Sequence, residues 1–486
     1  MKYMKKFASL LLALAMTLGL TTATFADGTN TITVTNTVAG QRYDLYKILN
    51  LDVNADLSAY SYTVNSAWAD FFAESAPGLT YVRIDSQGYV TWKDNADAAA
   101  FAKAAEAFAA SKPLTPLDSQ TAAEDTTELT FTGLEAGYYL VTSTLGTKAI
   151  VATTPDNPTP SIAEKNEVPT NEKKVEEDST LAYGPVNDAD IGQTVNFTST
   201  ITAQPGAENY VFHDTMSEGL TPDFSSIKIF VGNNELSSDH YNLVTTGLTD
   251  GCTFEIVFKQ SYLDTITAAT VLDVRYSAVL NEKAVIGSTG NPNTSKLSYG
   301  DSNNTKYTPD SQTTTKTWEF QIFKYAKNTN ETERPLTGAR FTLSKNADGS
   351  NPIRLVKISA EGTATHIYRV AQDGETSITE FESGASGTIQ IQGLDADTYY
   401  LTETLPPAGY NQLASPIKVT IDHNGNVTKD EDTTALADNM VKVENKSGTE
   451  LPSTGGTGTI IFYVLGSVLV LTAFVALVTK RRMNVR

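Results

Sequence analysis

Residues 393–401 read GLDADTYYL, and residues 133–140 read GLEAGYYL. Each string places a turn ahead of an apolar segment rich in tyrosine and leucine, the pattern expected where a turn leads into a buried strand. Because the same unit occurs in two distant parts of the chain, we predict that one type of β-sandwich domain is used repeatedly along it.

Length and composition narrow the classes of protein that this chain can be. Its 486 residues suffice for three or four domains of roughly 100–200 residues. Acidic residues outnumber basic ones, 56 to 36, and the net charge of −20 argues against a nucleic-acid partner. One cysteine, Cys252, cannot form an internal disulfide, and with four histidines it argues against a structural zinc site of Cys and His. We therefore expect no cofactor and no metal.

The N-terminus predicts export. Three lysines within the first six residues precede an apolar run from Phe7 to Leu20, and a small-residue cleavage site follows before Asp27. Residues 1–26 therefore read as a secretory signal peptide, which is removed and takes no part in the fold.

The C-terminus predicts a membrane-spanning segment. Thr459–Thr479 is an uncharged apolar run of 21 residues, long enough to cross a bilayer. The basic residues Lys480, Arg481 and Arg482 follow and would keep that end in the cytoplasm. Directly before the run stands the pentapeptide Leu451, Pro452, Ser453, Thr454 and Gly455.

This combination of LPSTG, apolar span and basic tail resembles the LPXTG cell-wall sorting signal of Gram-positive surface proteins. The resemblance implies that a sortase cleaves between Thr454 and Gly455 and passes the Thr454 carbonyl to an amine. The chain would then be a secreted protein attached covalently to peptidoglycan at the cell surface. An ordinary single-span anchor with a chance motif is the alternative.

Two seams divide the exported body, a Pro-rich stretch at 153–160 and a polar run at 299–317 without apolar periodicity. We predict an all-β chain of tandem Ig-like sandwiches, with one amphipathic helix at Asn95–Ser111. The predicted divisions are a signal peptide (1–26), an N-terminal domain (27–165), a middle domain (166–310), a C-terminal domain (311–447) and the sorting signal (448–486). Strands are expected at Thr31–Thr35, Lys228–Val231, Thr253–Phe258, Val271–Val279, Phe320–Lys324, Thr388–Ile391 and Ile417–Ile421.

Residues 161–175 read SIAEKNEVPTNEKKV. Together with DIGQTVNF at 190–197 and YVFHDTMSEGL at 210–220, they resemble the major (backbone) pilins of sortase-assembled pili. That family carries its linking lysine in a Lys-Asn pair at a domain junction, and the matching residue here is Lys165. Ala163 and Glu164 stand where the family has an aromatic-proline pair.

The resemblance implies a pilin that polymerises. The Lys165 amine of one subunit would attack the Thr454 acyl-sortase of the next, with Lys173 or Lys174 as alternative acceptors. The implied partners are a pilin-specific sortase, neighbouring copies of the chain, accessory pilins, peptidoglycan and host surface ligands whose identity stays open.

Residues 399–410 read YYLTETLPPAGY and resemble the glutamate box of Cna B-type domains. The resemblance implies that Glu403 catalyses a spontaneous isopeptide bond between Lys324 on the first strand and Asn445 on the last. Strand parity agrees, because residues two apart share a face. The three polar side chains fall in step with apolar neighbours, Lys324 with Ile322, Glu403 with Leu401 and Asn445 with Val443. All three are therefore expected in the core, where lone polar groups are costly.

The middle domain offers a similar set, Lys173 and Asn293 with Asp214 as the catalytic carboxylate and Asn291 as the alternative acceptor. In the N-terminal domain, Thr142 stands where Glu403 does in the repeated string, so we expect no crosslink there by this route.

Two other functions compete with the pilus shaft. A wall-anchored adhesin or minor pilin would carry the same sorting signal without being polymerised. An enzyme is disfavoured, because no Ser-His-Asp or zinc spacing occurs and isopeptide formation is a single turnover. A calcium loop at Asp422–Asn426 is the lesser alternative to a hairpin turn.

Overall fold

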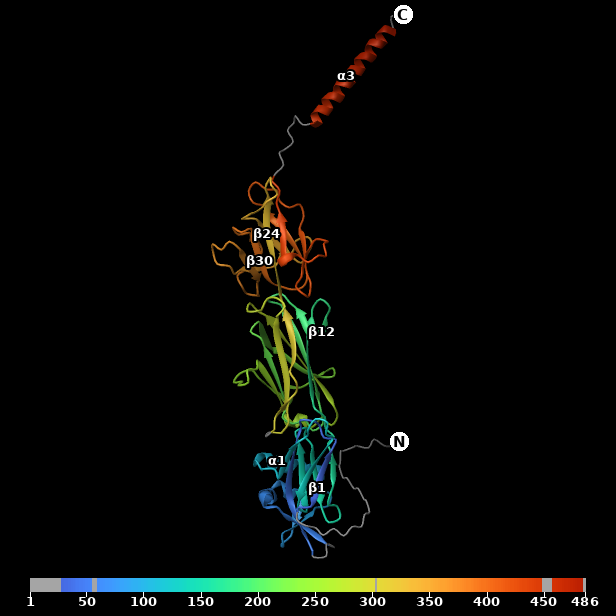
Figure 1. Ribbon diagram of the computed structural model, residues 1–486, viewed down its shortest axis with the longest axis vertical. Coiled ribbons are helices and arrows are strands. Elements are labelled where there is room, and N and C mark those ends of the chain that lie inside the picture. The colour runs from blue at the N-terminus through green and yellow to red at the C-terminus, as the bar shows by residue number, and fades with distance from the viewer. Residues whose placement is uncertain (1–27, 55–58, 302–303, 448–456, 484–486) are drawn as a thin grey trace. The chain divides into compact units, whose positions relative to one another are not determined.

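The computed structural model describes residues 28–54, 59–301, 304–447 and 457–483 (Figure 1). The chain divides between Thr317 and Trp318 into two compact units. Nearly every described element is a strand, so the expected all-β class is confirmed. The predicted signal peptide and the LPSTG motif at 451–455 lie outside the described residues.

The N-terminal part of the first unit holds two sheets. One has the order β10-β1-β7, and the other has the order β4-β5-β3-β2-β8-β9 with β6 also paired to β2. Its strands are β1 (Asn30–Thr35), β2 (Arg42–Val53), β3 (Tyr60–Val64), β4 (Val82–Ile84), β5 (Tyr89–Trp92), β6 (Asp118–Thr121), β7 (Glu128–Leu134), β8 (Gly137–Ser143), β9 (Lys148–Thr153) and β10 (Ser161–Ala163).

The helix α1 (Ala98–Ser111) covers an aromatic core in this part. It starts three residues later than the sequence pattern suggested, because Asn95 has a left-handed φ of 61° and Asp97 caps the first turn. The buried face of α1 packs against the short 3-10 helices η1 (Ser66–Phe72) and η2 (Pro77–Thr80).

The middle part of the first unit is a second pair of sheets, with the orders β12-β11-β14-β20-β16-β17 and β13-β23-β21-β15-β19-β18, and β22 paired to β21. Its elements are β11 (Thr170–Glu177), β12 (Ala182–Gly184), β13 (Val186–Asp188), β14 (Thr194–Ala203), β15 (Val211–Met216), β16 (Leu220–Val231), β17 (Asn234–Glu235), η3 (Ser238–His240), β18 (Tyr241–Val244), β19 (Phe254–Phe258), α2 (Gln260–Leu263), β20 (Thr270–Leu280), β21 (Asn291–Tyr299), β22 (Lys306–Tyr307) and β23 (Ser311–Lys316).

Strand β23 lies in a stretch that the sequence pattern treated partly as a seam and partly as the start of the C-terminal domain. It pairs with β21 and β13, so residues 311–316 belong to the middle sheet. Its inward side chains are Thr313 and Thr315, both buried. A strand that buries threonine carries no apolar periodicity, and this is why hydropathy did not reveal it.

The second unit is a sandwich of two sheets. One has the order β25-β24-β30-β28-β27, with β34 paired in parallel to β24, and the other has the order β29-β26-β31-β32-β33. The first and last strands of the unit are therefore neighbours. Its elements are β24 (Trp318–Lys327), β25 (Glu333–Pro335), β26 (Arg340–Ser344), β27 (Leu355–Lys357), β28 (His366–Val370), β29 (Phe381–Glu382), β30 (Thr388–Leu394), β31 (Thr398–Leu405), β32 (Ile417–Ile421), β33 (Val427–Lys429), η4 (Ala437–Asn439) and β34 (Met440–Glu444).

The turn between β32 and β33 is the predicted hairpin. Asp422 Oδ1 accepts the backbone N–H groups of Asn424 and Asn426, and Gly425 takes a φ of 80°. These bonds to its own turn account for one oxygen of the Asp422 carboxylate.

The long helix α3 (Thr457–Met483) follows the sandwich in sequence. Its segment Phe462–Arg481 has a mean hydropathy of 2.3 and buries none of its side chains against the rest of the chain. A mainly apolar helical segment of 20 residues whose side chains are all exposed fits the predicted membrane span.

Candidate functional site

Lys324, Glu403 and Asn445 converge in the core of the second unit. They come from β24, from β31 and from the residue after β34, and all three are buried. Lys324 Nζ makes an ion pair with Glu403 Oε1 at 2.9 Å. Asn445 Nδ2 donates to Glu403 Oε2 at 3.0 Å, so one carboxylate bridges the amine and the carboxamide.

The segment 411–413 fixes this cluster from one side. Asn445 Nδ2 also donates to the Asn411 carbonyl at 2.7 Å, and the Leu413 N–H donates to Glu403 Oε2 at 2.9 Å. The remaining carboxamide atom, Asn445 Oδ1, is buried without a hydrogen-bond partner. Two hydrogen bonds from Nδ2 therefore orient the Asn445 carboxamide, while its oxygen is available to accept a hydrogen bond.

Lys173, Asp214 and Asn293 form the corresponding cluster of the middle part, on β11, β15 and β21. Lys173 Nζ donates to Asp214 Oδ2 at 2.6 Å, and neither side chain is exposed to solvent. Since β11 belongs to one sheet and β21 to the other, this cluster spans the sandwich. Asp214 Oδ1 and Asn293 Oδ1 are both buried without hydrogen-bond partners.

Tyr276, on β20, is a fourth member that the sequence analysis missed. Its hydroxyl accepts from Lys173 Nζ and from Asn293 Nδ2 and donates to Asp214 Oδ2. The parity of β20 could have revealed it, because Tyr276 falls in step with the apolar residues Leu272, Val274 and Ala278.

Burial changes the protonation chemistry at both clusters. Loss of solvent lowers the pKa of Lys173 and of Lys324, because the interior disfavours an ammonium ion. Burial also raises the pKa of Asp214 to about 6. A lysine driven toward the neutral amine beside a carboxyl group is the arrangement that amide chemistry requires.

These two lysines stand apart from the others. In the described ranges, no lysine besides Lys173 and Lys324 is buried. The alternatives from the sequence lie elsewhere: Lys174 is partly exposed and pairs with Glu172 at 3.0 Å, while Asn291 bonds to Val285 and Thr315. The structure thus brings together Lys173 with Asn293 rather than Lys174 with Asn291.

At the junction after β10, Lys165 is exposed while the preceding Glu164 is buried. The Glu164 carboxylate accepts the backbone N–H groups of Lys165 at 2.8 Å and Asn166 at 2.9 Å. It also accepts the hydroxyls of Ser143, at 2.7 Å, and Thr147 from the turn between β8 and β9. One buried carboxylate therefore fixes the backbone from which Lys165 projects, a role that the sequence analysis did not assign to Glu164.

Thr142 is buried on β8, paired with Asp44 of β2. It lies at the position that the repeated string aligns with Glu403, and a hydroxyl there offers no carboxyl group. The expectation of no crosslink in the N-terminal domain stays a prediction.

Three family models match the chain. A Gram-positive pilin backbone subunit 2, Cna-B-like domain matches residues 191–304. A prealbumin-like fold domain matches residues 319–435, and an LPXTG cell wall anchor motif matches residues 443–485.

The chain is also similar to individual proteins and solved structures. The trypsin-resistant surface T6 protein of Streptococcus pyogenes serotype M6 is 25% identical over 327 residues, which is 55% of this chain and 60% of that protein. The match thus spans less than two thirds of the curated relative. The solved T6 backbone pilin of the same serotype aligns over 82% of this chain and 81% of its own, at 17% identity and a TM-score of 0.54. The major pilin SpaA of Corynebacterium diphtheriae aligns over 86% of this chain and 100% of its own, at 16% identity and a TM-score of 0.49.

The fold and the anchor match define a multi-domain, all-β surface protein attached to the Gram-positive cell wall. Within that class the chain carries the Gram-positive pilin backbone domain, so its predicted resemblance to the backbone pilins is confirmed.

Proposed function

We propose that this chain is the major subunit of a covalent pilus, which a sortase builds by joining Thr454 of one copy to Lys165 of the next. The observation that carries the proposal is the pilin backbone match at 191–304 in a chain that also matches the LPXTG anchor. The exposure of Lys165 at a junction held by Glu164 supports the choice of acceptor.

The joining reaction exchanges one acyl bond for another. A sortase cysteine attacks the Thr454 carbonyl, the Thr454–Gly455 peptide bond breaks, and the Gly455 amine leaves with the membrane segment. The neutral Lys165 amine then attacks the thioester, the sortase thiol leaves, and an isopeptide bond remains. A lysine suits this step because its amine stands at the tip of a long flexible stem.

We further propose that each buried cluster forms an internal crosslink. The neutral amine of Lys324 attacks Cγ of Asn445, Glu403 donates a hydrogen bond to the open carboxamide oxygen, and ammonia leaves with the protons that Glu403 shuttles. Lys173, Asn293 and Asp214 would do the same in the middle part. The supporting observations are the burial of both amines and the unpartnered oxygens of both amides.

The crosslinks would supply the covalent stabilisation that disulfides commonly give to exported β proteins. Each would close a loop of about 120 residues, which the loop-entropy model of disulfides values on the order of 5 kcal/mol. Since Lys324 lies on the first strand of this unit and Asn445 directly follows the last, a pulling force would pass through the covalent bond rather than the strand ladders.

Boiling cell-wall extracts in SDS tests the polymer. Wild-type cells should yield a ladder of high-molecular-weight species, and a Lys165→Ala strain should yield the single subunit. Lys174→Ala is the matched control, since Lys174 is a nearby, partly exposed lysine on β11, and its ladder should persist. A ladder that survives Lys165→Ala but disappears with Lys174→Ala would show that Lys174, not Lys165, is the acceptor.

A wall-anchored adhesin or minor pilin is the second candidate, because the sorting signal is common to both classes. It predicts no ladder in wild-type cells and a single subunit attached to peptidoglycan. The proposed role as a pilus shaft also implies accessory pilins and host ligands as partners.

A further inference from the structure

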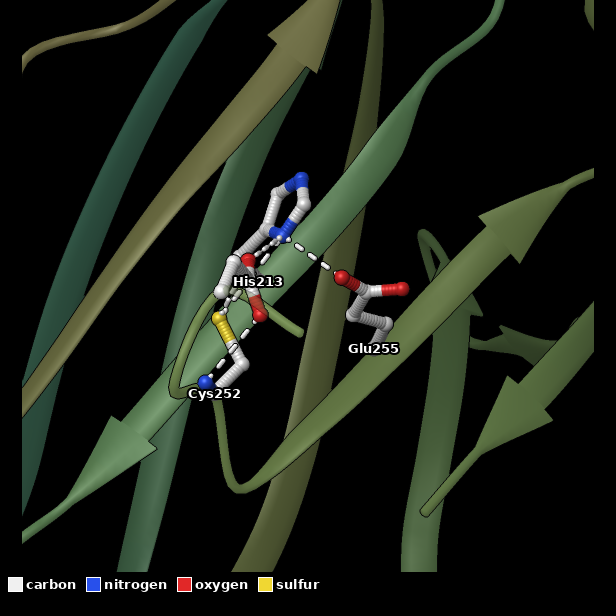
Figure 2. A group of neighbouring side chains, drawn as sticks. His213, Cys252 and Glu255 are labelled. Atoms are coloured by element: carbon white, nitrogen blue, oxygen red, sulfur yellow. Dashed lines mark hydrogen bonds and ion pairs between the residues drawn. The ribbon is translucent and has the colours of Figure 1, made fainter. Parts of the chain in front are cut away.

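Four metal-ligating side chains from three segments meet on the sheet that contains β15 and β19. His213 lies on β15, Glu255 lies on β19, and Asp250 and Cys252 lie in the turn that leads into β19. His213 and Glu255 are direct partners in the strand register. One donor atom from each of the four lies within 4.8 Å of the others. Figure 2 shows His213, Cys252 and Glu255 of this group.

Pairwise contacts connect all four side chains of this cluster. His213 Nδ1 lies 3.0 Å from Asp250 Oδ2 and 3.0 Å from Glu255 Oε1. Cys252 Sγ lies 3.0 Å from Asp250 Oδ2 and 3.7 Å from His213 Nδ1. A tetrahedral zinc ion with bonds of about 2.0–2.3 Å needs neighbouring donor atoms roughly 3.3–3.7 Å apart, so side-chain shifts of a few tenths of an ångström would open the three 3.0 Å contacts around an ion.

The second ring nitrogen of His213 has a polar partner of its own outside the cluster. Its Nε2 lies 3.1 Å from Ser298 Oγ, and that hydroxyl donates its single hydrogen to the Val211 carbonyl at 3.4 Å. Ser298 can therefore hold the ring through Nε2, which leaves Nδ1 as the nitrogen that faces the cluster. Nδ1 faces one oxygen each of Asp250 and Glu255, so a cation bound there would have a nitrogen and two oxygens as ligands.

We propose that His213, Asp250, Cys252 and Glu255 bind one divalent metal ion of the zinc class. The set of one nitrogen, one sulfur and two oxygens suits zinc, with the Cys252 thiol giving up its proton on binding. Residue counts argued against a site of Cys and His alone, whereas the fold completes the set with two carboxylates.

The position gives the ion a structural consequence. His213 precedes Asp214, and successive side chains on a strand point to opposite faces. The metal would therefore bind on the outer side of the strand that carries the crosslink carboxylate, and it would tie β15 to the turn before β19. An ion that binds the folded chain but not the unfolded chain should raise the melting temperature of the protein.

Cobalt(II) is the spectroscopic probe, with Zn²⁺ as competitor, and both are added to the full chain kept soluble in detergent. Wild type should bind one Co²⁺ with a sulfur-to-cobalt charge-transfer band that stoichiometric Zn²⁺ abolishes. Cys252→Ser should lose the band, and Asp250→Asn, a change of nearly equal size in an exposed turn, should weaken binding at least tenfold. Ser298→Ala should weaken it about 10–100-fold, the range found when a partner of a metal-bound histidine is removed.

His240→Gln is the matched control, because His240 lies on η3 against Tyr262, and His240 is not among the four ligands. Its Co²⁺ spectrum and affinity should equal those of wild type. Absence of saturable Co²⁺ binding would overturn the proposal and leave His213 hydrogen-bonded to two carboxylates without a metal. A charge-transfer band or affinity unchanged in both Cys252→Ser and Asp250→Asn would overturn it equally. None of these outcomes depends on whether the chain polymerises.

Discussion

At the scale of single residues, the chain buries two lysine amines that would normally be solvated by water. The interior lowers the pKa of Lys173 and Lys324 and so favours the neutral, nucleophilic form. Each amine lies beside a carboxylate, and each neighbouring amide has a buried oxygen without a partner. A new covalent bond would remove a buried amine that is costly to keep charged and would place the amide carbonyl in a fixed amide group. The residue chemistry therefore favours crosslinking over a persistent buried ion pair.

Glu403→Gln should abolish the crosslink of the second unit while keeping the size of the side chain. A carboxamide cannot shuttle the protons that amide exchange requires. Intact-mass spectrometry should find the variant heavier than the doubly crosslinked chain by one ammonia, beyond the mass of the substitution itself. Unfolding of the unit should become easier by a free energy on the order of 5 kcal/mol. Exposed Glu431→Gln is the control, and an unchanged ammonia loss in Glu403→Gln would contradict the role of Glu403.

Tyr276→Phe should slow the middle crosslink about tenfold, the effect of removing roughly one hydrogen bond of 1.4 kcal/mol from the reacting cluster. The ring that packs on Phe197 stays, and only the hydroxyl shared by Lys173, Asp214 and Asn293 is lost. The rate is read from the time course of ammonia loss during refolding. Tyr299→Phe, which removes another buried hydroxyl, is the control. Equal rates in the two variants would make Tyr276 a packing residue only.

The pH dependence of the middle crosslink follows from Asp214. Its raised pKa, about 6, means that the carboxyl group keeps its proton below that pH and loses it above. Only the protonated group can donate to the Asn293 oxygen, so bond formation on refolding should slow as pH rises through about 6. Mass spectrometry of samples refolded across this range tests the sign. A rate that rises steadily with pH would show that deprotonation of Lys173 alone controls the reaction.

At the scale of secondary structure, the sequence predicted the strands whose apolar residues alternate and missed a strand whose buried residues are polar. Ile417–Ile421 was expected as a strand and is β32, because its apolar residues recur at every second position. Strand β23 was not predicted because threonine, not an aliphatic residue, occupies its buried positions. Parity also placed Lys324, Glu403 and Asn445 in the core, where the structure has them. The cluster of His213, Asp250, Cys252 and Glu255 could not be predicted, because His213 joins the other three, which lie close together in sequence, only through the register of β15 with β19.

The junction element predicts an effect of Glu164 on polymerisation. Glu164→Ala would leave the Lys165 and Asn166 N–H groups and two hydroxyls without their acceptor, so the backbone around Lys165 would loosen. We expect fewer polymer bands on SDS gels although Lys165 is intact, with partial recovery in Glu164→Gln, which keeps one acceptor oxygen. Glu167→Ala, at an exposed neighbour, is the control. A wild-type ladder in Glu164→Ala would show that a fixed junction is not needed.

At the scale of the whole molecule, the parts form a consistent set. The predicted signal peptide would export the chain, the LPXTG anchor attaches it to the wall, and the apolar helix α3 would hold it at the membrane until it is joined. Between them lie β domains without disulfides, each of the last two with a buried Lys–Asn pair beside a carboxylate. A shaft under load needs subunits that neither separate nor unfold, and covalent bonds between and within subunits would meet both needs.

The most direct measurement is tandem mass spectrometry of a protease digest of purified surface filaments. The account predicts a branched peptide in which the carbonyl of Thr454 is bonded to the Lys165 side-chain nitrogen, with Gly455 and the residues after it absent. Filaments that dissolve into single chains in denaturant, or a Thr454 terminus found only on peptidoglycan, would contradict it.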